Sequence, residues 1–280
     1  MAQRPPNGHL DLPLKGPGHF GGYRVEVELI CVLLAVALAA GWVDAVVGGG
    51  GLVQLPVLLL ALPAAPPPAV LATDKLSSIA GTTVSAVGFA RRVRVQARVA
   101  VPATVLAVAL SGAGAVTAGR VPAEVFRPFV LVTLALVAVL VVARPTLGTR
   151  VQRRPARRRT LVPAVVLVGV VLPFYNGLVG PGTGAMILIA LTTLLGLDFV
   201  MGSATAKVVN VGANLGALVV FAAQGQVFWL LGLGMAACNV LGARVGTRTA
   251  LRRGAAFIRA TLLCVVAALI VKLSLDQLRL

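Results

Sequence analysis

Long apolar runs are the feature of this chain that most limits its possible folds. Of its 280 residues, 58% are hydrophobic and 12% charged, whereas a soluble domain carries about 25% charged residues. Runs of bilayer-spanning length recur throughout the sequence. The pattern predicts an all-α polytopic membrane protein with ten apolar segments: 27–47, 52–62, 69–90, 99–118, 125–143, 161–179, 184–197, 199–223, 227–243 and 255–275.

Segments 52–62 and 184–197 are too short to cross a bilayer core alone, since a spanning helix needs roughly 20 residues. We predict them to be half-helices, either re-entrant or parts of broken spans, beside eight full spans. Where a helix ends inside the bilayer, its open backbone must be shielded by protein or line a water-filled cavity.

The two halves of the chain repeat each other. Residues 47–51 (Val-Gly-Gly-Gly-Gly) align with residues 179–183 (Val-Gly-Pro-Gly-Thr), an offset of 132 residues. At the same offset, Lys75 aligns with Lys207. Glycine-rich breaks at corresponding positions of two halves are typical of transporters with a central binding site.

The distribution of arginine residues predicts the topology. The net charge is +17, and most of it lies in three groups at 91–98, 144–159 and 244–253. Basic loops stay in the cytoplasm, and an outside amino terminus with five segments per half places all three groups there. Because five is odd, the halves are predicted to be inverted repeats.

The predicted organisation has five parts. A polar tail, expected to be disordered or peripheral, is followed by the first repeat, an arginine-rich cytoplasmic linker, the second repeat and a short carboxyl-terminal tail. Their boundaries are 1–26, 27–143, 144–160, 161–275 and 276–280.

Several functions are disfavoured by the residue pattern. The arginines accompany no aromatic-interleaved fold, so we expect no nucleic-acid binding and instead contact with anionic lipid headgroups. Paired carboxylates, a Ser/His/Asp set and a phosphate-binding loop are missing from the sequence, which predicts no enzyme. The scattered cysteines and the two histidines of the polar tail predict neither a metal site nor a cofactor.

The glycine breaks are the first candidates for substrate binding. A half-helix that follows a break begins with unpaired N–H groups and the positive end of its dipole, which attract anions. These glycines can instead serve close helix packing. The repetition favours a site formed by Gly48, Gly49, Gly50, Gly51, Gly180, Gly182 and Thr183.

Asp44 and Asn176 occupy matching positions just before the breaks. Their side chains can supply partners for the backbone groups freed by the breaks. Asp44 can alternatively carry a coupling proton, because acidic residues within a membrane are usually functional. The sequence leaves both interpretations open for Asp44, and Asn176 is a candidate substrate-binding residue.

Lys75 and Lys207 lie about two turns into their spans, where a charge needs a cavity or a partner. Their ammonium groups can balance an anionic substrate; they can also snorkel to an interface or pair, Lys75 with Asp74 or Asp44. Further polar residues share these spans and predict a pathway rather than isolated interhelical contacts: Thr73, Thr205, Asn210 and Asn214.

These motifs resemble those of the sulfite exporter TauE/SafE family of membrane permeases. Residues 41–51 (GWVDAVVGGGG), followed by Leu-Pro at 55–56, are similar to the first-repeat signature of the family. Residues 174–184 (FYNGLVGPGTG) and 202–207 (GSATAK) are similar to the second. The resemblance covers roughly residues 27–275 and implies a permease of the bacterial plasma membrane for small sulfur-containing or organic anions, such as sulfite or sulfonates.

We therefore expect a secondary transporter of small anions that works by alternating access around a site at the membrane midplane. A passive channel for a small anion or neutral solute is the alternative, and a membrane scaffold that recruits partners through its basic loops is a third. The sequence does not determine the anion, the direction of transport, the coupling ion or the oligomeric state.

Overall fold

The computed structural model of the protein describes residues 9–10, 25–122, 125 and 158–277. The predicted apolar segment 125–143 therefore lies, apart from residue 125, outside the described residues. The same holds for most of the predicted tail 1–26 and linker 144–160, and for the last three residues of the tail 276–280.

The described residues form an almost entirely helical fold. Two short strands, β1 (His9–Leu10) and β2 (Val25–Glu26), pair antiparallel before the first helix. The helices are α1 (Val27–Val47), α2 (Gly50–Ala61), α3 (Pro67–Ala90), α4 (Ala97–Ala118), α6 (Arg158–Val166), the π-helix η1 (Leu167–Val171), α7 (Leu172–Leu178), α8 (Thr183–Leu195), α9 (Phe199–Ala223) and α10 (Trp229–Gln277).

Five of the described helical stretches are long and apolar enough to cross a membrane: Val27–Val47, Ala97–Ala118, Thr160–Leu178, Phe199–Ala223 and Trp229–Ile258. Helices α2 and α8 are short and apolar, as predicted. Large apolar side chains such as Val105 and Leu233 stay exposed on the outer helices, which suits contact with lipid. The total of eight full spans stays a prediction.

Local sequence explains where the second-half helices start and stop. Asp198 caps α9, because its carboxylate accepts hydrogen bonds from the N–H groups of Val200 and Met201 at 2.9 Å. Gly254 has a φ of 71° and breaks α10 into two arms. The first arm runs past the predicted end at residue 243, so Arg244 and Arg248 lie exposed on a helix instead of in a loop.

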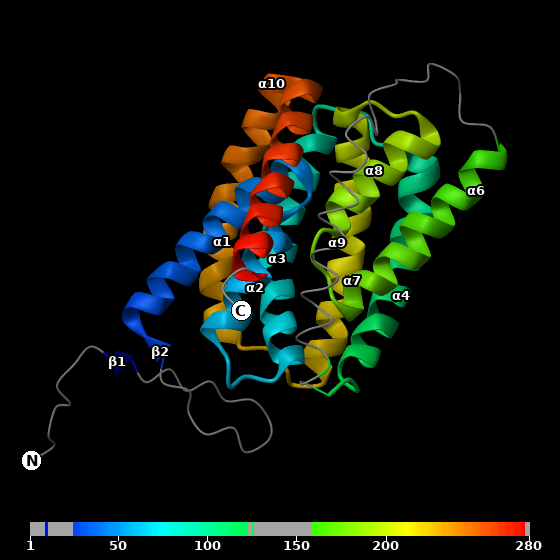
Figure 1. The fold of residues 1–280 in the computed structure, drawn as a ribbon. Helices are drawn as coiled ribbons and strands as arrows, with labels where there is room; N and C mark the ends of the chain where they lie inside the picture. Colours follow the sequence, from blue (N-terminus) through cyan, green and yellow to red (C-terminus); the bar gives the residue numbers. More distant parts are fainter. Residues whose placement is uncertain (1–8, 11–24, 123–124, 126–157, 278–280) are drawn as a thin grey trace, which may run out of the picture.

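Helices at matching positions of the two halves run in opposite directions. In Figure 1, α3 and α9 lie side by side in the centre and are antiparallel; α1 likewise opposes the α6–α7 helix, and α4 opposes the first arm of α10. The contacts are exchanged as well: α1 packs on α10 as α7 packs on α4, and α3 packs on α10 as α9 packs on α4.

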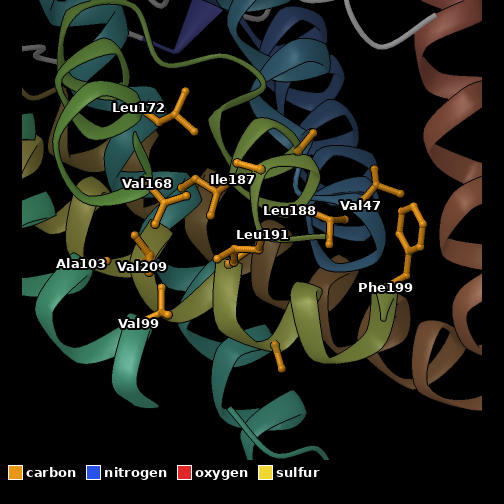
Figure 2. Packing of buried hydrophobic residues seen from close by; sticks show 14 of the residues in the cluster. Val47, Val99, Ala103, Val168, Leu172, Ile187, Leu188, Leu191, Phe199 and Val209 are labelled. Carbon is orange, nitrogen blue, oxygen red and sulfur yellow. The ribbon is translucent and has the colours of Figure 1, made fainter. Parts of the chain in front are cut away.

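The short helices are the centres of two hydrophobic clusters. Leu52, Leu55 and Leu58 of α2 are fully buried in the first cluster, which also contains Phe221. Apolar residues of α8 lie in the second cluster; Figure 2 shows Ile187, Leu188 and Leu191 among side chains that include Val168 and Val209. Each half-helix is therefore held in place by apolar burial.

Glycines permit close crossings of backbone at matching places. A methyl group at Gly114 of α4 would clash with the Phe174 carbonyl oxygen of α7. One at Gly246 of α10 would lie 2.6 Å from the Trp42 carbonyl oxygen of α1. Residues 114 and 246, like 42 and 174, differ by the repeat offset of 132 residues.

We predict that Gly246→Ala lowers the thermal midpoint of the purified protein in detergent. The added methyl group overpacks the crossing of α1 and α10, which costs about 1–3 kcal/mol. Gly234→Ala is the matched control on the same helix, since its methyl group would lie 3.5 Å from Leu34. Equal midpoints for the two variants would contradict a close crossing at Gly246.

Candidate functional site

Both glycine breaks are turns that return the chain into the bundle. Gly48 has a φ of 78°, Gly180 of 97° and Gly182 of 77°, values that favour glycine. The first break contacts the start of the half-helix of the other half, because the Ala185 N–H donates to the Gly48 carbonyl oxygen at 3.0 Å. The two breaks are thus neighbours inside the bundle.

The second break is closed by side chains that lie close to it in the sequence. The hydroxyl of Tyr175 donates to the carbonyl oxygen of Pro181 at 2.7 Å. Thr183 donates its hydroxyl to the Gly180 carbonyl oxygen at 2.8 Å. These bonds satisfy backbone oxygens that the break leaves without helical partners. Tyr175 was not predicted as a site residue, although its position just before the break was a usable signal.

The two lysines bridge the halves reciprocally. The ammonium of Lys75 donates to the Asn176 side-chain oxygen at 2.8 Å. That of Lys207 donates to the backbone carbonyl oxygen of Asp44, also at 2.8 Å. Each lysine therefore reaches the residue that precedes the glycine break of the opposite half. Both are buried, with 2% and 3% of their surface exposed, so neither snorkels to an interface.

The residues before the breaks also have matching partners. Thr82 of α3 donates to the Asp44 carboxylate at 2.8 Å. Asn176 donates to the side-chain oxygen of Asn214 of α9 at 3.1 Å. Positions 82 and 214 differ by the repeat offset of 132 residues. The described partners of both side chains are polar groups of the central helices.

Two small cavities lie at this meeting point, and each has free space on the order of one water molecule. Of the predicted site residues, the larger cavity is lined by Asp44, Gly48, Gly51, Lys75, Asn176, Gly180, Gly182, Thr183, Asn210 and Asn214. The smaller cavity is lined by Lys207, together with Asp44, Gly48 and Asn210. Each lysine therefore faces a cavity beside one glycine break.

Asn210 is the residue best placed to respond to a ligand. It lines both cavities, its surface is 6% exposed, and its side-chain oxygen has no hydrogen-bond partner among the described residues. Buried polar atoms in proteins are nearly always hydrogen-bonded. Rotation of the carboxamide presents either its oxygen or its NH2 group to the cavity.

Four predicted site residues lie elsewhere. Thr73 accepts a hydrogen bond from the Phe228 N–H at 3.3 Å, and Thr205 accepts one from the Gln96 N–H at 3.1 Å. These bonds hold the turns that begin α10 and α4, so the two hydroxyls are used structurally. Gly50 packs closely on α1, and Gly49 packs beside Leu52. Neither glycine lines the cavities.

One polar cluster was missed by sequence reasoning as a site feature. Gln54 of α2 donates to the Asp74 carboxylate at 2.9 Å. Its side-chain oxygen accepts from Ser77 at 3.2 Å and from Asn239 of α10 at 3.3 Å. Gln54 is the one polar residue of α2. A polar residue at the centre of an apolar half-helix was a signal that could have revealed the cluster.

The fold and this centre define a polytopic helical membrane protein whose halves meet at a buried, polar and charged core. The sequence model of the sulfite exporter TauE/SafE family matches residues 33–273. The chain belongs to this family of multi-pass membrane transporters, which confirms the resemblance drawn from the glycine and lysine motifs.

Curated relatives support the assignment over almost the whole length. A probable membrane transporter protein from Sinorhizobium, ORF9, is 35% identical over 89% of this chain and 94% of its own. The probable membrane transporter protein YfcA of Escherichia coli K12 is 32% identical over 91% and 93%. One from Haemophilus influenzae is 28% identical over 90% and 97%. No solved structure matches the chain.

We predict that Asp44→Asn preserves the fold, whereas Asp44→Leu lowers the thermal midpoint in detergent. Asparagine keeps an oxygen that accepts from Thr82, as Asn214 and Asn176 pair in the other half. Leucine leaves the buried Thr82 hydroxyl without this partner, which costs about 1–3 kcal/mol. Equal losses in both variants would show that the fold needs the negative charge itself.

Proposed function

We propose that the protein is a secondary transporter of small anions, of the sulfur-containing or organic class to which sulfite and sulfonates belong. Transport proceeds by alternating access around the centre where the two glycine breaks meet. The reciprocal lysine contacts, Lys75 with Asn176 and Lys207 with Asp44, carry this proposal. They place two ammonium groups beside the two breaks, inside the part of the bundle that is screened from water.

The donor groups around the cavities suit an oxyanion. The described hydrogen-bond acceptors of both ammonium groups are neutral oxygens, and an anion is a stronger acceptor for either of them. The half-helices α2 and α8 start at the breaks and direct the positive ends of their dipoles toward this region. Thr183 and Asn214 add side chains that hydrogen-bond to oxyanions. The anion would therefore lie between the breaks.

We propose that the two halves form an inverted repeat, the arrangement that supports alternating access. Matched helices run antiparallel, helix contacts are exchanged between the halves, and the bonds of Lys75, Asn176 and Thr73 have counterparts at the repeat offset. Two halves related in this way can exchange conformations, which opens the centre to the opposite side.

One asymmetric contact indicates what the exchange would involve. The Gly48 carbonyl accepts from Ala185 at the start of α8. At the repeat offset the corresponding pair is the Gly180 carbonyl and the Val53 N–H of α2. Gly180 instead accepts from Thr183. In the opposite-facing state, we propose that the second break packs against α2 and the first break separates from α8.

The size of the cavities favours a carrier over the alternative of a passive channel. Space on the order of one water molecule does not admit an oxyanion. The helices around the centre must therefore move before an anion binds. In a carrier this movement is part of each transport cycle and limits the rate.

We predict that anion flux into proteoliposomes saturates and that preloading with unlabelled anion accelerates uptake of the labelled anion. Both follow because each turnover needs the conformational exchange. Measurements with radiolabelled sulfite and sulfate check this expectation. Flux that rises linearly with concentration and ignores preloading would indicate the channel instead.

We predict that Lys75→Met and Lys207→Met each weaken anion binding about ten- to a hundredfold. The reason is the loss of a charge-assisted hydrogen bond worth about 1.5–3 kcal/mol, while methionine keeps most of the side-chain volume. Thermal shifts of purified protein with sulfite, sulfate, thiosulfate, sulfonates and small carboxylates measure the effect, since a ligand of the folded state raises the midpoint.

Arg248→Ala is the control for this experiment, because Arg248 is exposed on α10 and its loss changes the net charge by the same amount. Its binding should equal that of the wild type. If all three variants bind equally well, the lysines do not balance the charge of the substrate.

A further inference from the structure

We propose that Asp74 is the proton-binding site of this transporter, and that each anion is carried together with a proton. This inference rests on the proposed anion transport and extends it by naming the coupling ion and the group that holds it. It is carried by the position of Asp74, by its partners and by the way they differ between the halves.

Asp74 lies in the wall of the larger cavity, next to Lys75. Its surface is 3% exposed, and one carboxylate oxygen accepts from Gln54 at 2.9 Å. Gln54 in turn accepts from Ser77 and Asn239. All three partners are neutral groups that can donate or accept hydrogen bonds. The cluster can therefore rearrange around either a carboxylate or a carboxylic acid.

The cluster has no counterpart at the repeat offset. At the repeat offset, the positions of Gln54, Asp74, Ser77 and Asn239 hold Met186, Ala206, Val209 and Ala107. The matching helices α8, α9 and α4 carry these apolar residues instead, so helices in this arrangement pack without the cluster. By contrast, Asp44 has a polar counterpart, Asn176. Their hydrogen-bond partners, Thr82 and Asn214, also occupy corresponding positions. A buried carboxylate that the matching helix α9 lacks indicates a function.

The charges around the cavities explain why an anion would bring a proton. Among the residues that line them, the charged ones are Asp44, Asp74, Lys75 and Lys207, which sum to zero. Asp74 on α3 is acted on by Lys75 of the same helix and by Asp44 of α1; its partners from α2 and α10 are neutral. A bound anion adds an uncompensated negative charge where water is scarce, and a proton on Asp74 removes it.

Asn210 supplies an independent sign that this region receives a ligand. Its buried side-chain oxygen is unpartnered and belongs to the wall of both cavities. A water molecule in the cavity can donate a hydrogen bond to this oxygen. When the centre is open, such a water accepts a proton from the medium and passes a proton on to an oxygen of Asp74, so that no hydroxide is left behind. The proton leaves Asp74 for the medium, together with the anion, when the centre opens on the other side.

The coupling has a definite sign. Because the anion-bound protein holds one proton more than the free protein, raising the pH weakens anion binding, by up to about tenfold per pH unit. The same reciprocity requires that adding the anion makes the protein take up protons.

The first test needs no anion. Infrared difference spectra of the purified protein, recorded between acid and neutral pH, report the carbonyl band of protonated carboxylic acids. We expect a band that is present in the wild type and in Asp198→Asn but lost in Asp74→Asn. The Asp74→Asn variant keeps the hydrogen bond from Gln54, and the Asp198→Asn variant keeps the helix cap of α9. If the wild type and Asp74→Asn show the same carbonyl bands, the proposal is wrong.

The second test measures proton uptake in weakly buffered protein with a pH indicator. The probe is methanesulfonate, which does not titrate near neutral pH, with sulfate as the second anion. We expect about one proton per bound anion in the wild type and Asp198→Asn, and none in Asp74→Asn. In proteoliposomes, Asp74→Asn should lose the accumulation driven by a pH gradient, whereas Asp198→Asn should show the accumulation of the wild type.

The outcomes separate the two proposals. If methanesulfonate, sulfate and sulfite all leave the thermal midpoint unchanged, the proposed substrate class is wrong. The infrared band then still decides whether Asp74 binds a proton. If anions bind without proton uptake, or if Asp74→Asn still accumulates anion on a pH gradient, proton coupling at Asp74 is wrong. A lower midpoint for Asp74→Asn with unchanged proton uptake would assign the cluster a structural role alone.

Discussion

The structure depends on the constraint that backbone opened inside a membrane must be covered by protein. Two glycine breaks release N–H and C=O groups inside a bundle of apolar helices, where such groups need partners from the protein. The fold answers by placing the breaks against each other and against α3 and α9. Gly48 accepts from Ala185, and Tyr175 donates to Pro181. Each lysine donates a hydrogen bond to the residue that precedes the break of the opposite half. Packing, polarity and the candidate site all follow from covering these turns.

The sequence predicted the helices well because their signals are local. The apolar segment 199–223 coincides with α9, and Gly50–Ala61 and Thr183–Leu195 are the short helices expected after the breaks. The end of the first arm of α10 was placed too early. Judged by charge alone, the exposed Arg244 and Arg248 predict a loop, but both lie on the helix. The helix is interrupted only at Gly254.

The candidate site could be predicted from the sequence where its residues recur at the repeat offset, and it could not be predicted where they do not recur. Lys75 and Lys207 stand out as a repeated pair, and the structure brings both to the cavities. Thr73 and Thr205 repeat just as faithfully, yet they hold turns; repetition marks shared roles of any kind. The Gln54 cluster has no repeat, and its members are distant in sequence, so only the folded chain assembles it.

The reciprocal lysine contacts also bear on how the protein is made. The hydrogen-bond partner of Lys75, Asn176, lies 101 residues further along the chain, and that of Lys207, Asp44, lies 163 residues earlier. A ribosome therefore delivers the first half to the membrane before the group that satisfies its buried ammonium exists. Until the second half arrives, that segment has to keep its charge near water or a helper protein. Insertion of this protein is consequently a joint event, completed only when both halves are present.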